Sequence, residues 1–438
     1  MSWRGRSGGS WGRLGMAFEI VPLGAVANIT KLAGFEFTKY ISYDDAGEII
    51  ALRALNLRNG ELDLSDVKRI KRSVSESLER SKLYINDILL TYTGNGYGDC
   101  AIITENDKYH LAPNICKISP LPGLIHPYFL YSYIRSKSFY TQMSNHMVGS
   151  SQPTIPMKTI RVLEVPLPSF ETQERIVAII HSLDEKVRLN QRINDNLERQ
   201  AQAVFTDWFI EFTPFANEEF VMSPTGIEIP KSLQMKQIIN IPHILETGRR
   251  PKGGATFSGM PSVGAENVKR LGQFDFSSNK YIPEDFAAKQ KTGRITGYEL
   301  LLYKDGGKPG TFIPHFSMFG EGFPYKEFFI NEHVFKLDFF DRGKNEFAYL
   351  YMQTDYVNRW LANNGGKAAI PGINQHDVNA IWIYDLEHPQ VKCFCEWVQP
   401  LFKTIFCNCY ENMQLARLRD TLLPKLMSGE IDVSNLQF

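Results

Sequence analysis

The chain has 438 residues, of which 43% are hydrophobic and 22% charged, a composition that supports more than one buried core and excludes a disordered or fibrous protein. Its 48 Lys and Arg balance 48 Asp and Glu, so the net charge is zero and any DNA-binding surface must be local. No stretch reaches the roughly 18 consecutive apolar residues of a membrane-spanning helix, and we expect a soluble, cytoplasmic protein with no membrane partner.

The first part of the chain predicts an extension followed by a mixed domain. Residues 1–16 are rich in Gly, Ser, Arg and Trp, and we interpret them as a disordered extension. Residues 17–170 contain short β-branched or aromatic runs broken by Gly, Asn and Asp, which predict strands, and one helical stretch. The expected strands are 48–52, 87–92, 101–104 and 115–118, and the expected helix is 128–143.

Residues 171–212 predict a long helix, because 171–209 contain neither Gly nor Pro and are dense in good helix formers. Apolar residues recur at helical spacing for four heptads and form one wide stripe. A helix from Ile176 to Trp208 extends about 50 Å, which is too long for one compact domain to cover, so we expect a partner helix. The residues expected to face that partner are Ile176, Ile180, Leu183, Val187, Asn190, Ile193 and Leu197.

Residues 390–438 supply the partner as a second long helix and a tail. Leu401, Ile405, Asn412, Leu415 and Leu422 lie along its expected seam. A buried Asn in such a seam fixes the register of the two helices. An equally good interpretation is that the Asn side chains of both helices face solvent.

Four cysteines in this segment invite a zinc interpretation, at Cys393, Cys395, Cys407 and Cys409. On one helix the two Cys-x-Cys pairs would stand about 21 Å apart along the axis, whereas tetrahedral ligation needs all four sulfurs at one point. We therefore expect reduced, packed cysteines and no metal site.

Residues 213–389 predict a second mixed domain, and it repeats the first. Residues 56–65 match 267–277 with one insertion, 87–90 match 299–302, and 114–118 match 333–337. Three matched blocks in one order, each half closing with a long helix, indicate an internal duplication. The expected fold class is α+β (mixed α/β), with two similar domains separated by two long helices that pair as a coiled coil.

No nucleotide-binding, methyltransferase or hydrolase motif is found, and we expect no catalytic residue. Polar, Gly-rich loops with amide, cationic and aromatic side chains instead favour DNA contact, and they occupy corresponding positions in the two repeats. For each residue an ordinary turn is the alternative. The candidate DNA-binding residues are Thr93, Asn95, Tyr97, Ser150, Ser151, Gln152, Arg249, Arg250, Lys252, Lys304, Lys308, Lys367 and Asn374.

The chain resembles the DNA specificity subunit of type I restriction-modification systems. The resemblance is carried by PLPSFETQERIVAIIHSLDEKVRLNQRINDNLE (166–198) with AQAVFTDWFIEF (201–212), and by LRDTLLPKLMSGEIDV (418–433). The second helix departs from the family because it lacks the usual Gln-x-x-Ile opening and carries cysteines.

The resemblance implies a non-catalytic subunit that reads a bipartite DNA target, one half-site per recognition domain. It also implies that the two long helices form an antiparallel coiled coil, which acts as the spacer. Its partners would be double-stranded DNA, DNA adenine methyltransferase subunits and restriction/translocase subunits, which would carry S-adenosylmethionine, ATP and Mg²⁺ while this chain holds no cofactor. Because the candidate loops differ between the repeats, we expect an asymmetric target. The alternative is a coiled-coil interaction scaffold without DNA specificity.

Overall fold

A computed structural model describes residues 18–58, 60–94, 96–149, 152–267, 270–273, 280–308, 310–323, 325–366 and 371–435. They form two compact units: unit 1 runs to Glu185 and resumes at Ala416, and unit 2 comprises Lys186–Leu415. The extension expected over residues 1–16 lies outside the described residues.

Unit 1 is built on a four-stranded antiparallel sheet. Its strands, in spatial order, are β2 (Ala27–Lys31), β10 (Ile115–Pro120), β7 (Ile88–Thr91) and β8 (Cys100–Ile102). Every residue of β7 is buried, which explains its run of apolar residues, because a strand covered on both faces cannot alternate with polar residues. The strands predicted over 87–92, 101–104 and 115–118 are confirmed within two residues at either end.

A second sheet in unit 1 contains one parallel pair. Its order is β6 (Lys68–Ile70), β3 (Ile49–Leu52), β9 (Tyr109–Leu111), with β3 antiparallel to β6 and parallel to β9. Two strand pairs complete the unit: β1 (Glu19–Pro22) with β11 (Glu164–Leu167), and β4 (Leu57–Arg58) with β5 (Glu61–Leu62). Its short helices are α1 (Leu23–Val26), α2 (Gly34–Tyr40), α3 (Arg72–Ser77), α4 (Pro127–Ile134), α5 (Lys137–Ser144), α6 (Met157–Ile160), η1 (Ala54–Asn56) and η2 (Glu79–Ser81).

The prediction of a single helix over 128–143 is wrong in one respect, because the chain forms two helices, α4 and α5, with a break at residues 135–136. Ser136 is extended, and its side chain accepts a hydrogen bond from the Phe139 backbone N–H, so it caps a new helix. Ser is a strong N-cap residue, and here capping prevails over the continuous helical periodicity of the sequence.

Unit 2 repeats both sheets. The first has the order β15 (Ile244–Thr247), β24 (Val334–Asp338), β19 (Leu300–Tyr303), β22 (Phe316–Met318), and the second β17 (Lys280–Ile282), β16 (Met260–Val263), β23 (Phe328–Ile330), β18 (Arg294–Ile295). The remaining strand pairs are β12 (Phe220–Met222) with β13 (Glu228–Pro230), β14 (Met235–Gln237) with β25 (Trp382–Tyr384), and β20 (Gly307–Lys308) with β21 (Thr311–Phe312). Its short helices are α8 (Glu284–Lys289), α9 (Arg342–Met352), α10 (Asp355–Gly365), α11 (Gln375–Asn379), η3 (Thr213–Phe215), η4 (Ile238–Asn240) and η5 (Ala265–Asn267).

The repeat predicted from sequence is confirmed by this topology. Strand order and direction agree in the first sheet, and the parallel pair β3–β9 has its counterpart in β16–β23. A buried lysine marks the same position of each middle strand. The Lys117 ammonium donates to the Lys82 carbonyl at 2.7 Å, and the Lys336 ammonium donates to the Arg294 carbonyl at 3.1 Å. These lysines lie in the matched blocks 114–118 and 333–337, so the sequence alignment is the structural one.

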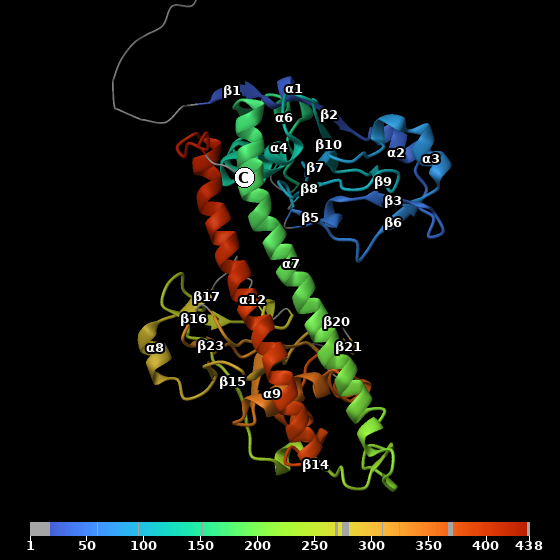
Figure 1. Ribbon diagram of the computed structural model, residues 1–438, viewed down its shortest axis with the longest axis vertical. Coiled ribbons are helices and arrows are strands. Elements are labelled where there is room, and N and C mark those ends of the chain that lie inside the picture. The colour runs from blue at the N-terminus through green and yellow to red at the C-terminus, as the bar shows by residue number, and fades with distance from the viewer. Residues whose placement is uncertain are drawn as a thin grey trace, which may run out of the picture. The chain divides into compact units, whose positions relative to one another are not determined.

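The two long helices are α7 (Phe170–Phe209) and α12 (Pro389–Met427), drawn green and red in Figure 1. In unit 1 the Asp184 carboxylate binds Arg135 of the α4–α5 break at 3.2 Å and Arg419 of α12 at 2.9 Å. In unit 2 the aromatic residues Phe205 and Phe209 of α7 are buried against Phe394 of α12 and Phe347 of α9. The predicted fold class is confirmed: mixed α/β, two similar repeats and two long helices. Among the described helices, none is long and apolar enough to cross a membrane.

Candidate nucleic-acid interface

Two of the predicted loops of unit 1 lie side by side. Thr93 and Thr154 pair antiparallel. The Gly94 N–H donates to the Pro153 carbonyl at 2.8 Å, and the Ile155 N–H donates to the Tyr92 carbonyl at 3.0 Å. Since β7 ends at Thr91 and α6 begins at Met157, this loop pair is held between a buried strand and a helix.

The same loop pair occurs in unit 2. Asp305 and Gly372 pair antiparallel there. The Gly306 N–H donates to the Pro371 carbonyl at 3.2 Å, and the Ile373 N–H donates to the Lys304 carbonyl at 2.8 Å. The backbone bonds are therefore equivalent in the two units, with β19 and α11 replacing β7 and α6. A backbone frame that is retained while its side chains differ is what two readers of different half-sites require.

Two tyrosines form an aromatic pair in unit 1, one from the loop that follows β7 and one from α5. The rings of Tyr97 and Tyr140 stack with centroids 5.3 Å apart and 13° between their planes. The Tyr140 hydroxyl donates to the Tyr97 hydroxyl at 2.9 Å, and hydrogen bonds to the Ser144 and Tyr140 hydroxyls lower the pKa of Tyr97. Gly98 has φ +91°, and a Cβ there would approach the Tyr140 ring to 2.9 Å, so a larger residue would push the pair apart.

Charged groups surround the corresponding loops of unit 2. His333 Nδ1 lies 2.8 Å from an Asp305 carboxylate oxygen, and its Nε2 lies 3.4 Å from Glu332. Arg250 also contacts the Glu332 carboxylate, at 3.2 Å. The Lys304 ammonium lies 3.4 Å from the Glu332 carbonyl oxygen and 5.9 Å from the centroid of the Phe335 ring. This group offers both donors and acceptors to a polar ligand, unlike the paired tyrosines of unit 1.

The structure accounts for the other predicted loop residues individually. Gln152, Arg249, Arg250 and Lys252 are exposed and accessible to a ligand. The Asn374 side-chain oxygen accepts hydrogen bonds from the His376 and Asp377 backbone N–H groups, so this residue is the N-cap of α11. Capping is a structural role that the sequence pattern did not reveal. The side chain of Lys308 lies outside the described part of the structure. Four further predicted residues lie outside it entirely: Asn95, Ser150, Ser151 and Lys367.

Sequence reasoning missed two exposed aromatic residues, one in each unit. Tyr140 is 45% exposed and reaches Tyr97 from α5, and Phe257 is fully exposed in the basic loop that follows β15. A signal for Phe257 was present, because an aromatic residue in the Gly-rich run 248–259 has no strand or helix to bury it. Tyr140 carried no such signal, since its contact spans 43 residues of sequence.

The helix-pairing residues fall within each unit as follows. In unit 1, Ile176 and Ile180 are buried, while Leu183 and Leu422 are half-buried. In unit 2, Asn190 and Ile405 are buried and Val187, Leu197, Leu401, Asn412 and Leu415 are half-buried.

Ile193 departs from the prediction, because it is 37% exposed. Asn194, one residue further along, takes its place in the seam. The Asn408 amide donates to the Asn194 side-chain oxygen at 2.8 Å. The register that sets Ile176 at position a places Ile193 at d, whereas the seam contacts here are made by Asn190 at position a and Asn194 at position e.

Asparagines line this seam of unit 2. The Asn190 amide donates to the Asn412 side-chain oxygen at 2.9 Å and to the Glu411 carboxylate at 2.7 Å. Together with the Asn194–Asn408 bond, these contacts run in opposite residue order on α7 and α12, so the helices are antiparallel here. Of the two interpretations left open by the sequence, the seam position holds for Asn190.

The four cysteines of α12 differ in their exposure to solvent. Cys393 and Cys407 are exposed, whereas Cys395 packs near Gly343 and Cys409 near Asn194. Burial raises the pKa of the Cys395 and Cys409 thiols to about 12. Within the described ranges, no cluster of three or more His, Cys, Asp or Glu side chains is arranged to hold a metal ion.

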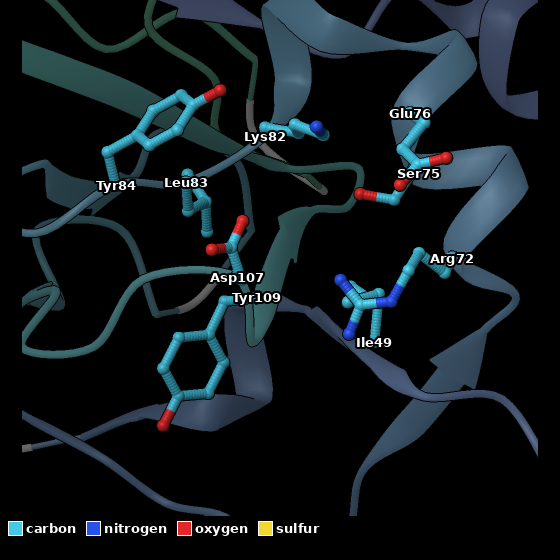
Figure 2. Close-up of a pocket in the computed structure, with 9 residues that line it drawn as sticks. All are labelled: Ile49, Arg72, Ser75, Glu76, Lys82, Leu83, Tyr84, Asp107 and Tyr109. Carbon is cyan, nitrogen blue, oxygen red and sulfur yellow. The ribbon is translucent and has the colours of Figure 1, made fainter.

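Figure 2 shows a small cavity of unit 1 beside α3. Its volume of about 10 Å³ admits at most one water, so it is not a ligand site. The residues that line it are Ile49, Arg72, Ser75, Glu76, Lys82, Leu83, Tyr84, Asp107 and Tyr109.

The chain is similar in sequence to known DNA specificity proteins. Residues 17–199 match the family model described as type I restriction modification DNA specificity domain. The chain is 26% identical over 322 residues to the type I restriction enzyme MjaIX specificity subunit of Methanocaldococcus jannaschii, covering 73% of this chain and 72% of that protein. It is 22% identical to the HindI specificity subunit of Haemophilus influenzae, covering 92% and 97% respectively.

A solved structure shares the fold. The crystal structure of the S subunit of a type I restriction-modification system from M. genitalium matches with a TM-score of 0.50 at 13% sequence identity, over 94% of this chain and 97% of that one. At this identity the likeness concerns the fold alone, and it agrees with the repeat and the paired long helices described above.

Proposed function

Because the chain belongs to the family of type I restriction-modification specificity subunits, we propose that it selects the DNA target of a methyltransferase and restriction complex without itself performing catalysis. Unit 1 reads one half-site and unit 2 the other. The chain acts in the cytoplasm, where the chromosomal DNA is accessible.

The observation that carries this proposal is the repeated loop pair. Equivalent backbone bonds present Thr93 in unit 1 and Lys304 and Asp305 in unit 2, each at the end of a buried strand. Loops held by a rigid sheet are suited to base recognition, since donors and acceptors must match the major-groove pattern of a base pair. Because stacked tyrosines occupy one copy and charged groups the other, the two half-sites differ and the target is asymmetric.

The partners follow from the same assignment. Double-stranded DNA, adenine methyltransferase subunits and restriction/translocase subunits assemble with this chain. S-adenosylmethionine, ATP and Mg²⁺ belong to those partner subunits. The antiparallel helices set the spacer between the half-sites.

Methylation mapping tests the proposal. The chain is co-expressed with the methyltransferase encoded beside it, and methylated bases are mapped genome-wide by single-molecule sequencing, with a strain lacking this chain as control. We expect a split, non-palindromic motif that appears only when the chain is present. Unchanged methylation by a complex that demonstrably assembles would contradict the specificity role and support a scaffold without DNA specificity. A palindromic motif would contradict only the asymmetry.

A further inference from the structure

An open cleft lies at the β2 edge of the main sheet of unit 1, and residues of β2 and of α6 line it. Its volume is about 260 Å³, far above the one-water cavity beside α3. Lys31 at the end of β2, Arg80 of η2 and Arg161 directly after α6 line it. Three basic side chains from separate parts of the chain therefore converge on one cleft.

The positive charge of this cleft is largely uncompensated. Lys31 and Arg161 form no ion pair with any described residue, whereas Arg80 binds the Glu36 carboxylate at 2.9 Å. The Arg161 guanidinium donates to the Ile29 carbonyl at 2.9 Å, which anchors it without neutralising it. The Thr30 hydroxyl is buried and has no hydrogen-bond partner in the described part of unit 1. No Asp or Glu lines the cleft, so the site favours an anion.

The cleft adjoins the loop pair. The Lys31 ammonium lies 5.4 Å from the centroid of the Tyr92 ring, and Tyr92 holds the loop pair together through the Ile155 N–H. Met157, which follows that loop as the first residue of α6, also lines the cleft. A DNA strand whose bases meet the loop pair would therefore carry its backbone past these cations.

At two described positions of unit 2 that correspond to this cleft, neutral side chains replace Lys31 and Arg161. The Leu245 carbonyl is the counterpart of the Ile29 carbonyl in the matched sheets, and it accepts a hydrogen bond from the neutral Gln375 side chain at 2.9 Å. The register that pairs Lys31 with Cys116 pairs Thr247 with Phe335, so a threonine occupies the position of Lys31. Two otherwise equivalent edges thus differ in charge, which indicates that the basic cleft is not a requirement of the fold.

We propose that Lys31, Arg161 and Arg80 form a phosphodiester-binding cleft that grips the DNA backbone beside the half-site read by unit 1. The inference rests on the proposed DNA-binding function. Arginine and lysine neutralise backbone phosphates without reading bases, so this cleft contributes affinity and register but no sequence preference.

Salt dependence tests the cleft. The full chain, assembled with its methyltransferase subunits, is titrated with its mapped target duplex between 50 and 200 mM KCl. Each phosphate contact contributes about 0.9 to the slope of log Kd against log salt concentration. We expect Lys31→Gln to reduce that slope by about 0.9, and Lys31→Gln with Arg161→Gln by about 1.8, with discrimination against altered half-sites unchanged. Lys231→Gln is the matched control, because the Glu219 carboxylate already neutralises that lysine at 2.7 Å.

Neutral phosphate analogues locate the contact. Duplexes with a single methylphosphonate are scanned through the unit 1 half-site and bound by the wild type and by Lys31→Gln. At one or two adjacent positions, we expect the wild type and Lys31→Gln to bind the methylphosphonate duplex equally well. At these positions the phosphate charge that Lys31 contacts has already been removed from the DNA. An unchanged slope in a variant that still binds its target, or no coupled position, would overturn the cleft inference alone. Loss of sequence-specific binding by the wild type would instead refute the proposed function. Because Arg161 anchors a backbone carbonyl, Lys31→Gln alone keeps the test valid if the double variant fails to fold.

Discussion

The paired tyrosines of unit 1 show how two residues distant in sequence form one surface. Tyr97 comes from a loop and Tyr140 from α5, and their stacked rings are held by the hydrogen bond between their hydroxyls. Exposed aromatic rings on a rigid support are favourable contact residues, because they present a large area at little entropic cost.

Truncation of this pair yields a half-site-specific prediction. Tyr97→Ala removes the loop ring of the pair, and we expect a loss of about 1–2 kcal/mol in target binding, typical of an interface aromatic. Only the half-site read by unit 1 is affected. Tyr97→Phe is the control, because it keeps the stacked ring while removing the hydroxyl. Equal loss of discrimination at both half-sites, measured by anisotropy with half-site variants, would contradict the assignment.

Glu346 in unit 2 gives a pH prediction. Its side chain is fully buried and accepts a hydrogen bond from Arg342 at 2.8 Å, but Arg342 also binds Glu321 at 2.7 Å. Burial, with one cation shared between two carboxylates, raises the pKa of Glu346 to about 8. The folded state therefore retains a proton that the unfolded chain loses near pH 4.3, so stability falls as pH rises between these values and levels off above about 8.

Glu346→Gln is neutral at every pH and removes this dependence. Relative to the wild type, we expect the variant to gain on the order of 4 kcal/mol of stability between pH 5 and 9, at about 1.4 kcal/mol for each pH unit up to about 8. Thermal unfolding midpoints of both proteins across this range measure the difference. A constant difference from pH 5 to 9 would show that Glu346 keeps the same protonation state in the folded and unfolded chains.

The long helix α7 has buried apolar residues towards both of its ends and asparagines between them. Asn190 and Asn194 meet Asn412 and Asn408, and Asn190 Oδ1 is buried with no partner among the described residues. Such a seam stabilises less than leucines would, but it penalises shifted registers because displaced amides lose their partners. We infer that register, rather than maximal stability, is the property retained here.

Helix length has a direct consequence for the target. Seven residues inserted after Glu185 in α7, together with seven after Leu415 in α12, leave the contacts within each compact unit intact. The insertion lengthens each helix by about 10.5 Å, or about three base pairs at roughly 3.4 Å each. We expect a spacer about three base pairs longer with both half-sites unchanged. Insertion into α7 alone is the control, since it breaks the helix pairing, and methylation mapping reads the result. An unchanged spacer would refute the role of the helices as a ruler.

For the whole molecule, two separate compact units predict independent half-site recognition. Tyr97→Ala in unit 1 and Arg250→Gln in unit 2 share no described contact, so their effects on target binding are expected to add within about 0.3–0.5 kcal/mol. Dissociation constants of the two single variants, the double variant and the wild type complete the cycle. A coupling well above that range would show that the two readers communicate.

The sequence alone predicted the duplication, the two long helices and the Gly-rich loops at corresponding positions of the two repeats. Those features depend on local patterns, because hydrophobic periodicity, matched blocks and Gly-rich breaks are written in consecutive residues. It also placed Asn190 in the helix seam as one of two interpretations.

Only the tertiary structure decided which side chains remain available. Asn374 is used as a helix cap, Ile193 yields its seam position to Asn194, and Tyr140 joins Tyr97. The basic cleft was likewise invisible, since Lys31, Arg80 and Arg161 are separated by 49 and 81 residues and converge only when β2, η2 and α6 pack. Periodicity specifies which face of an element is apolar, whereas the partner that covers this face, and the polar groups brought together at its edge, follow from packing between distant segments.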